Sequence, residues 1–340
     1  MSKLLLHIGT HKTGTTSVQH FFASNRDALR AQGIFYPPTD LGGQFGDQYA
    51  HHAIAHAIAN VSGDGTGASR AKAYFDALRD RVVPGETVVI SAEPLYRHRL
   101  RDAQGKSLGR MAYLRAVRDA IGDFDVSVIA MVRRQDLFLE SLYSENIMAG
   151  TYRDPIERFI ADRAPQADYA QRLAEWGAVF GSENIHVRPY EAAEYGASLE
   201  RYFLQWVGGT VSDSLTFGSR RNVTVPRELV EFKRVINASI EPAWNAPVRH
   251  WVETMARRRA SSFGALGKFY LTSEQRARVL QAAEPGNRDV ARQYLGRSEL
   301  FSDTTLPLQA DPPPLPHHTF EEIAGSMVGS LARDAARVRR

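Results

Sequence analysis

The residues that most directly suggest chemistry lie near the amino end, where a lysine stands among glycine and hydroxyl residues. Lys12 lies between Gly9 and Gly14, and an apolar run precedes this segment while a helical apolar pattern follows it. Backbone N–H groups at a turn that opens a helix, together with the helix dipole, form a ready site for a phosphate group. The pattern therefore predicts an anion site formed by Lys12, Thr13, Gly14, Thr15, Thr16 and Ser17.

The position of the lysine sets this segment apart from a nucleoside triphosphate loop. In that loop, G-x-x-x-x-G-K-[ST], the lysine directly follows the second glycine. Here Thr15 occupies that position, and Lys12 lies two residues before Gly14. From there an ammonium group could reach the outer oxygens of a bound phosphate without taking the usual β/γ-phosphate role. An ordinary glycine turn between a strand and a helix is the alternative.

A second segment with suitable chemistry lies more than a hundred residues later. The apolar, β-branched run 126–132 reads as a central strand, and it is followed by Arg133, Arg134 and a helical pattern that carries Ser141. Arginine offers a planar fork of donors to phosphate oxygens, and a serine hydroxyl adds one more. Taken alone, an arginine at the end of a strand is more typical of a salt bridge.

A third basic segment, 219–226, precedes a predicted helix that starts near Arg227. Its candidates for contact with an anion are Arg220, Arg221 and Asn222. A solvated basic turn is the alternative interpretation of this segment.

Together these segments resemble the PAPS-dependent sulfotransferases, which bind 3′-phosphoadenylyl sulfate (PAPS) and release adenosine 3′,5′-bisphosphate. The resemblance covers about residues 3–240. It implies that residues 13–17 hold the 5′-phosphate and that Lys12 stabilises charge on the oxygen that bridges to the leaving sulfuryl group. It also implies that Arg133 and Ser141, eight residues apart, grip the 3′-phosphate, and that 220–222 close over it. The family usually has an acid four residues after the arginine, whereas Asp136 here comes three residues after it.

Sulfuryl transfer also needs a group that takes the proton of the acceptor. Glu93 follows the predicted strand 87–91, at the strand end where a catalytic group belongs in this architecture. The other candidates are histidines of the segment 49–56, in which His51 or His52 could line the acceptor site and His56 fits a plain helix surface. The family uses a glutamate or a histidine, so Glu93 and His52 both remain candidates. His52 and His56 have metal-ligand spacing, but no third ligand accompanies them, and we expect no metal.

Alternating strand and helix patterns predict the fold class, an α/β protein with a central, mainly parallel sheet flanked by helices in three layers. The predicted strands are 3–8, 87–91, 126–132 and 185–188, and the predicted helices between them are 14–32, 68–81, 109–121, 135–149 and 169–180. We expect a PAPS-binding core at 1–240. A helical extension at 241–340 contains a proline-rich arm at 304–318 and a closing helix at about 320–337.

Composition narrows the class of protein further. The 340 residues carry a net charge of only +4, which does not call for a general polyanion binder, and we expect no nucleic-acid partner. Cysteine is absent, and no apolar run is long enough to span a membrane, so we expect a cytoplasmic protein. The predicted activity is transfer of a sulfuryl group from PAPS to a hydroxyl or amine of a small molecule, glycan or lipid. A P-loop-type kinase or nucleotide hydrolase and a non-catalytic nucleotide-binding protein are the alternatives; the sequence leaves the acceptor and the oligomeric state open.

Overall fold

The computed structural model describes residues 2–60, 63–218, 225–258, 263, 267, 269–303, 314 and 316–338, of which 330–338 are described by backbone alone. The chain forms two compact units. The first comprises 1–134, 168–220 and 283–304, and the second comprises 135–167, 221–282 and 305–340. The predicted boundary at residue 240 separates a core domain from a helical extension, which is a different division from these compact units, and it stays a prediction.

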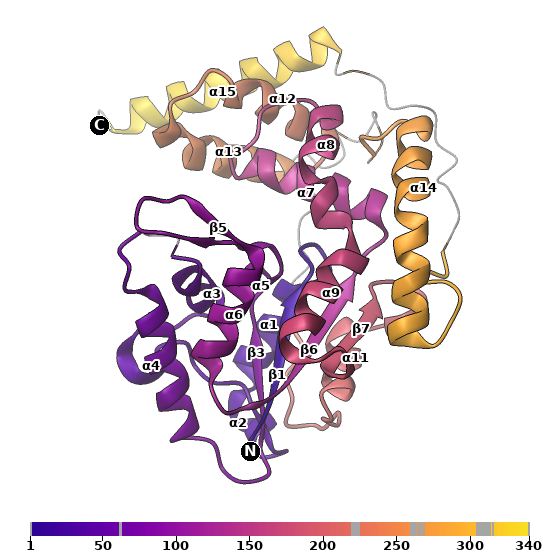
Figure 1. The fold of residues 1–340 in the computed structure, drawn as a ribbon. Coiled ribbons are helices and arrows are strands. Elements are labelled where there is room, and N and C mark those ends of the chain that lie inside the picture. Colours follow the sequence, from indigo (N-terminus) through magenta and orange to yellow (C-terminus); the bar gives the residue numbers. More distant parts are fainter. Residues whose placement is uncertain are drawn as a thin grey trace. The chain divides into compact units, whose positions relative to one another are not determined.

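A five-stranded parallel sheet forms the centre of the first unit (Figure 1). Its strand order is β2-β3-β1-β6-β7, so β1 lies in the middle with β3 and β6 on either side. The bounds are β1 Lys3–Gly9, β2 Ile34–Phe35, β3 Thr87–Ser91, β6 Asp125–Val132 and β7 Ile185–Pro189. The predicted strands and the predicted fold class are confirmed, and only the two-residue β2 was missed in this sheet.

Both faces of this sheet are buried, which explains the nearly continuous apolar runs of its strands. Leu4, Leu6 and Ile8 of β1 belong to one hydrophobic cluster, and Leu5 belongs to another. Helices α3 (His52–Ile58), α4 (Gly67–Arg79), α6 (Arg110–Ile121) and α9 (Tyr169–Phe180) contribute to the first cluster, and α1 (Thr15–Ser24) and α11 (Leu199–Trp206) contribute to the second. The result is the expected arrangement of helix, sheet and helix in three layers.

The first unit contains the following helices and one small hairpin. The helices are α1 Thr15–Ser24, α2 Arg26–Arg30, α3 His52–Ile58, α4 Gly67–Arg79, α5 Pro94–Arg97, α6 Arg110–Ile121, α9 Tyr169–Phe180, α10 Ala192–Tyr195 and α11 Leu199–Trp206. Strands β4 Leu100–Arg101 and β5 Ser107–Gly109 pair antiparallel. Short 3₁₀ turns lie at Leu41–Gly43 and Ser182–Asn184, and a π-helical turn lies at Ala291–Leu295.

The second unit is helical in its described part and has a hydrophobic cluster of its own. Its elements are α7 Gln135–Met148, α8 Ile156–Ala167, α12 Arg227–Asn237, a 3₁₀ turn Pro242–Trp244, α13 Asn245–Arg258 and α15 His317–Val338. Helix α14, Ser273–Val290, begins in this unit and ends in the first. Helix α15 confirms the predicted closing helix, whereas most of the predicted proline-rich arm lies outside the described residues.

One helix prediction was wrong: the segment 14–32 contains two helices because Asn25 interrupts the first. Its side-chain amide donates to the carbonyl oxygens of Phe21, at 2.7 Å, and Thr216, at 2.9 Å, and accepts from the Thr216 N–H at 2.7 Å. The side chain therefore ties the end of α1 to a distant segment. A local apolar pattern cannot reveal such a contact.

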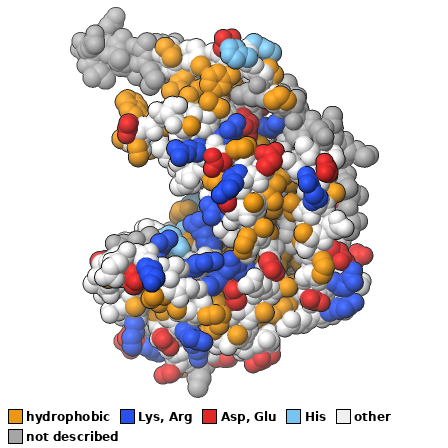
Figure 2. Space-filling view, turned by 45° about the horizontal axis from the view of Figure 1, so that its top comes forward, with side chains coloured by type: hydrophobic (Ala, Val, Ile, Leu, Met, Phe, Trp, Pro, Cys, Tyr) orange, Lys and Arg blue, Asp and Glu red, His pale blue; other side chains and the backbone are white. Residues whose placement is uncertain are grey.

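Side chains of both charge signs lie on the face of the molecule that Figure 2 shows. On the face shown in Figure 2, Lys and Arg side chains lie in several groups, with Asp, Glu and hydrophobic side chains among them. In the described part of the chain, no helix is long and apolar enough to cross a membrane.

Candidate functional site

The predicted anion loop is a turn between β1 and α1. Gly9 ends the strand and Thr15 begins the helix, with Gly14 as its N-cap in the left-handed conformation (φ 71°). Lys12, at the crest, also has a positive φ of 67°, which is uncommon for a residue with a side chain. Such backbone conformations tend to occur at functional sites. The Ser17 N–H donates to the Gly14 carbonyl oxygen at 3.0 Å. N–H groups at the start of a helix commonly lack a partner within the helix, so a turn of this kind can donate to an anion.

Gly14 is required by its surroundings as well as by its backbone angle. A Cβ atom at this position would overlap a methyl group of Leu199, at the start of α11, and would lie 3.4 Å from the Tyr190 ring. Gly9 is similarly close to Glu93, because a Cβ there would lie 3.0 Å from the Glu93 Cγ. The loop is therefore packed closely between segments that follow two other strands.

The strand order brings three predicted segments to one edge of the sheet. Glu93 follows β3, the Lys12 loop follows β1 and Arg133 follows β6, and these three strands are adjacent and parallel. The chain leaves β1 toward β3 on one side and later returns to β6 on the other. This makes β1 a switch point, where α/β sheets bind their ligands at the carboxyl ends of the strands.

Glu93 is buried and surrounded by hydrogen-bond donors. Its carboxylate accepts from the hydroxyl of Thr15 and from Gln19 Nε2 at 3.1 Å, and it contacts His52 Nε2, with which it forms an ion pair when that ring is protonated. Burial alone would raise its pKa, but the hydrogen bonds from His52 and Thr15 and the charge of His52 more than offset this effect. The pKa of Glu93 is therefore well below its ordinary value, and the group is a carboxylate at neutral pH.

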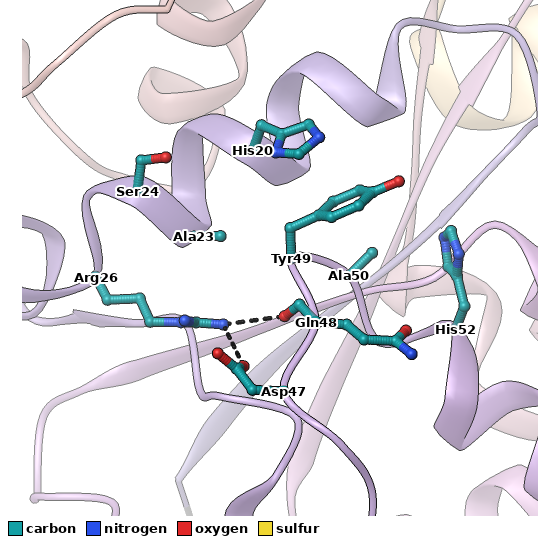
Figure 3. Close-up of a pocket in the computed structure, with 9 residues that line it drawn as sticks. All are labelled: His20, Ala23, Ser24, Arg26, Asp47, Gln48, Tyr49, Ala50 and His52. Atoms are coloured by element: carbon teal, nitrogen blue, oxygen red, sulfur yellow. Dashed lines mark hydrogen bonds and ion pairs between the residues drawn. The ribbon is translucent and has the colours of Figure 1, made fainter. Parts of the chain in front are cut away.

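The histidines near Glu93 differ in their surroundings. His52 has a side chain that is 31% exposed and lines a pocket (Figure 3). His51 is fully buried, and its ring contacts the Pro37 carbonyl oxygen through Nε2, at 3.0 Å, and accepts from the Ser91 N–H through Nδ1, at 3.2 Å. Burial lowers the pKa of His51 to about 4. The expectation that His51 could line an acceptor site is thus wrong, because its ring is part of the core.

His56 has a histidine partner instead of the plain helix surface expected for it. Its Nδ1 lies 2.7 Å from Nε2 of His98, which follows α5. Burial lowers the pKa values of both, that of His98 to about 3. Among the described residues, no group of three or more His, Cys, Asp and Glu side chains could hold a metal ion.

Arg133 contacts the Lys12 loop directly. Its Nη1 donates to the Lys12 carbonyl oxygen at 3.0 Å, and its guanidinium group lies 5.8 Å from the centre of the Tyr190 ring. Its neighbour Arg134 donates to the carbonyl oxygen of Asp303 at 2.8 Å. Arg133 thus joins the strand end of β6 to the Lys12 loop, and its contact with a phosphate stays a prediction.

The hydroxyl groups of the loop have partners of several kinds. Thr13 is buried and donates to the Thr10 carbonyl oxygen at 2.6 Å, Thr15 donates to Glu93, and Ser17 donates to Glu200 at the start of α11. Thr16 is half-buried. The Thr13 and Thr15 hydroxyls thus hold the shape of the loop, and their contact with a phosphate stays a prediction.

The remaining predicted residues lie elsewhere in the chain. Ser141 is half-buried on α7, in the second unit. Arg220, Arg221 and Asn222 lie outside the described residues. Asp136 is fully buried in the second unit, where it forms an ion pair with Arg276.

Gln19 is the residue that sequence reasoning missed. It is fully buried on α1, and its Nε2 donates to Glu93 and, at 3.1 Å, to Ser91 Oγ. The available signal was one polar side chain on a helix face that also carries Val18 and Phe22. A buried amide on an apolar face needs hydrogen-bond partners, and here it helps to orient the carboxylate.

Comparison with known proteins gives weak likenesses. No family model matches the chain. An uncharacterized protein of Archaeoglobus fulgidus is 25% identical over 177 residues, which are 51% of this chain and 47% of that protein, so the match spans about half of the relative. Two solved structures are similar: a sulfotransferase from Alicyclobacillus acidocaldarius (16% identity, 77% of this chain and 98% of that one, TM-score 0.39) and the sulfotransferase domain from the curacin biosynthetic pathway (12%, 63% and 76%, TM-score 0.37).

Proposed function

We propose that the protein transfers a sulfuryl group from PAPS to a hydroxyl or amine acceptor and releases adenosine 3′,5′-bisphosphate. The observation that carries the proposal is the hydrogen bond from Arg133 to the Lys12 carbonyl oxygen. It joins the proposed 3′-phosphate residue to the proposed 5′-phosphate loop, which share one edge of the sheet. Glu93 follows the strand on the other side of that loop.

The donor set of the first unit suits a phosphorylated nucleotide. The left-handed Gly14 lets the turn pass closely beside Leu199 into α1, whose N-terminus supplies N–H groups for a 5′-phosphate. Lys12 in the turn and Arg133, which donates to the Lys12 carbonyl oxygen, add positive charge. Arg133 would hold the second phosphate through the rest of its fork, which presents five N–H donors in total.

The reaction would be an in-line displacement at sulfur. A bond forms between the acceptor oxygen or nitrogen and sulfur, while the bond from sulfur to the bridging oxygen of the 5′-phosphate breaks. Negative charge then develops on the leaving phosphate, where the Lys12 ammonium and the loop N–H groups stabilise it. The acceptor proton goes to a base of the protein.

His52 is the better-supported base, with Glu93 as its orienting partner. Glu93 is buried, accepts from three side chains and has a strongly lowered pKa, so it is a weak proton acceptor. A base is most effective when its pKa lies near the working pH. In this arrangement His52 Nε2 donates to Glu93, and the other ring nitrogen takes the acceptor proton while the carboxylate stabilises the imidazolium.

The alternative functions predict other features of the loop. A kinase or nucleotide hydrolase with a standard loop needs a lysine at position 15 and a hydroxyl for magnesium. Thr15 instead donates to Glu93. A non-catalytic nucleotide binder would use the same turn and is distinguished by kinetics.

The test combines binding with turnover. Thermal shifts with adenosine 3′,5′-bisphosphate, ATP and NAD should show the largest stabilisation with the bisphosphate, since a ligand that binds the folded state raises its stability. Release of the bisphosphate from PAPS is then followed with an acceptor panel. Lys12→Ala should lower turnover about a hundredfold while binding of the bisphosphate is largely kept. Unchanged turnover would contradict the role of Lys12, and absence of a bisphosphate shift would contradict the proposed donor.

A further inference from the structure

The first unit contains a pocket of about 460 Å³ beside His52 (Figure 3). One wall comes from α1 and the start of α2, and the other comes from the segment that leads to α3. The side chains that line it are His20, Ala23, Ser24, Arg26, Asp47, Gln48, Tyr49, Ala50 and His52. Most of these residues play no part in the anion loop.

Hydrogen bonds connect this pocket to the anion loop. His52 forms part of the pocket lining, and its Nε2 pairs with Glu93, which in turn accepts from Thr15 at the first position of α1. A hydroxyl group placed against His52 would therefore lie next to the proposed base. We infer that this pocket binds the acceptor, and that the acceptor is an uncharged molecule rich in hydroxyl groups, such as a sugar. This inference rests on the proposed function.

The charges in the pocket are already paired with each other. Arg26 Nη2 lies 3.3 Å from Asp47 Oδ1 and donates to the Gln48 carbonyl oxygen at 3.2 Å. The pair presents donors and acceptors side by side with no net charge, and the Gln48 amide and the Ser24 hydroxyl add groups of both kinds. Two hydroxyl groups on neighbouring carbon atoms can each donate and accept a hydrogen bond, so they complement a surface with donors and acceptors side by side. A charged acceptor would have to compete with the Arg26–Asp47 pair.

Tyr49 supplies the aromatic part of the pocket. It is 39% exposed, and its ring stacks on His20 with centroids 3.8 Å apart. This contact holds the ring in place and leaves an apolar surface with a polar tip, onto which the C–H face of a sugar ring can pack. The other apolar side chains of the lining are the small Ala23 and Ala50. A large apolar phenol would therefore gain little buried area here.

The test uses the full chain with adenosine 3′,5′-bisphosphate present. Saturation-transfer NMR is recorded with three probes: a mixture of neutral methyl glycosides, a methyl glucuronide and 2-naphthol. We expect signals from the neutral glycosides, and a loss of about tenfold in their affinity in Tyr49→Ala and in Asp47→Asn. Asp76→Asn is the matched control, because Asp76 is another surface acid of the unit that is paired with an arginine. It should retain the signals.

Several results would overturn the inference. They are an absence of glycoside signals, glycoside signals that persist in both pocket variants, and stronger binding of 2-naphthol or the glucuronide at the same residues. Failure of the proposed function has a different signature. In that case adenosine 3′,5′-bisphosphate gives no thermal shift, whereas glycoside binding that depends on Tyr49 would still identify the pocket.

Discussion

Glu93→Gln removes one charge from the centre of the candidate site and leaves the shape of the side chain nearly intact. The amide oxygen can replace Oε2 and still accept from His52 and Gln19, while the amide nitrogen faces the Thr15 hydroxyl. The substitution therefore keeps the number of hydrogen bonds and removes their ionic character. It tests whether the ionised carboxylate stabilises this part of the fold.

The expected cost follows from these three contacts. A hydrogen bond to a charged group contributes about 1.5–3 kcal/mol and a neutral one about 0.5–1.5 kcal/mol, so each loses about 1 kcal/mol. His52 is 31% exposed, and solvent weakens its share. We therefore expect Glu93→Gln to lower the free energy of unfolding by about 2–3 kcal/mol at neutral pH.

The pH dependence identifies the source of this loss. The pKa of Glu93 is lowered from an ordinary 4.5, so the stabilisation by its carboxylate is complete above that pH and is lost as the pH falls further below it. The difference between the wild type and Glu93→Gln should therefore narrow in acid. Urea unfolding at about pH 7, about pH 5 and about pH 3.5 measures it.

A surface pair serves as the control for this experiment. Glu284 pairs with Arg288 one helical turn away, and its side chain is 54% exposed, so Glu284→Gln should change stability by no more than about 0.5 kcal/mol. The reasoning is refuted if Glu93→Gln costs no more than this control, or if its cost stays constant down to the lowest pH.

Three further predictions follow from the same geometry. Arg133→Ala should weaken binding of adenosine 3′,5′-bisphosphate about 10–100-fold and binding of the 5′-monophosphate much less, whereas Arg134→Ala should leave both affinities unchanged. Calorimetry measures the affinities of both nucleotides for each variant. Equal losses for the two nucleotides in Arg133→Ala would contradict the proposed role of Arg133. Gly14→Ala should destabilise the fold by about 2–3 kcal/mol more than Gly85→Ala in urea unfolding, because both positions have a positive φ but only Gly14 meets Leu199. The free energy of unfolding should fall as the pH drops from 6.5 to about 4, because burial lowers the pKa values of His7 and His51 to about 4 and only the unfolded chain takes up these protons. The expected loss is up to about 1.4 kcal/mol per pH unit for each histidine. A free energy of unfolding that does not change over this pH range would show that these rings are not kept neutral.

The central sheet and the three segments at its edge could be predicted from the sequence because both signals are local. Strands that are buried on both faces have nearly continuous apolar sequences, and 3–8, 87–91 and 126–132 are such segments. The residues that follow a parallel strand must emerge at its carboxyl end. Lys12, Glu93 and Arg133 could therefore be assigned to one edge before their distances were known.

What could not be predicted depends on contacts between distant residues. Asn25 ends α1 through bonds to Thr216, and Gln19 reaches Ser91 and Glu93, more than seventy positions away. His51 and His52 are neighbours in the sequence, yet His51 is buried in the core and His52 lines a pocket. Nothing in their local pattern separates these two environments, because both depend on how α3 packs.

The order of the strands also explains why the anion loop and the proposed base are linked in this unit. Because β1 lies between β3 and β6, the loop after β1 must contact whatever follows each neighbour. Thr15 bonds to Glu93 on one side, and the Lys12 carbonyl oxygen accepts from Arg133 on the other. A ligand that moves the loop would thus act on both contacts at once. Through Glu93 it would also act on His52, so that the proposed nucleotide site and the proposed base are linked by hydrogen bonds within a single unit.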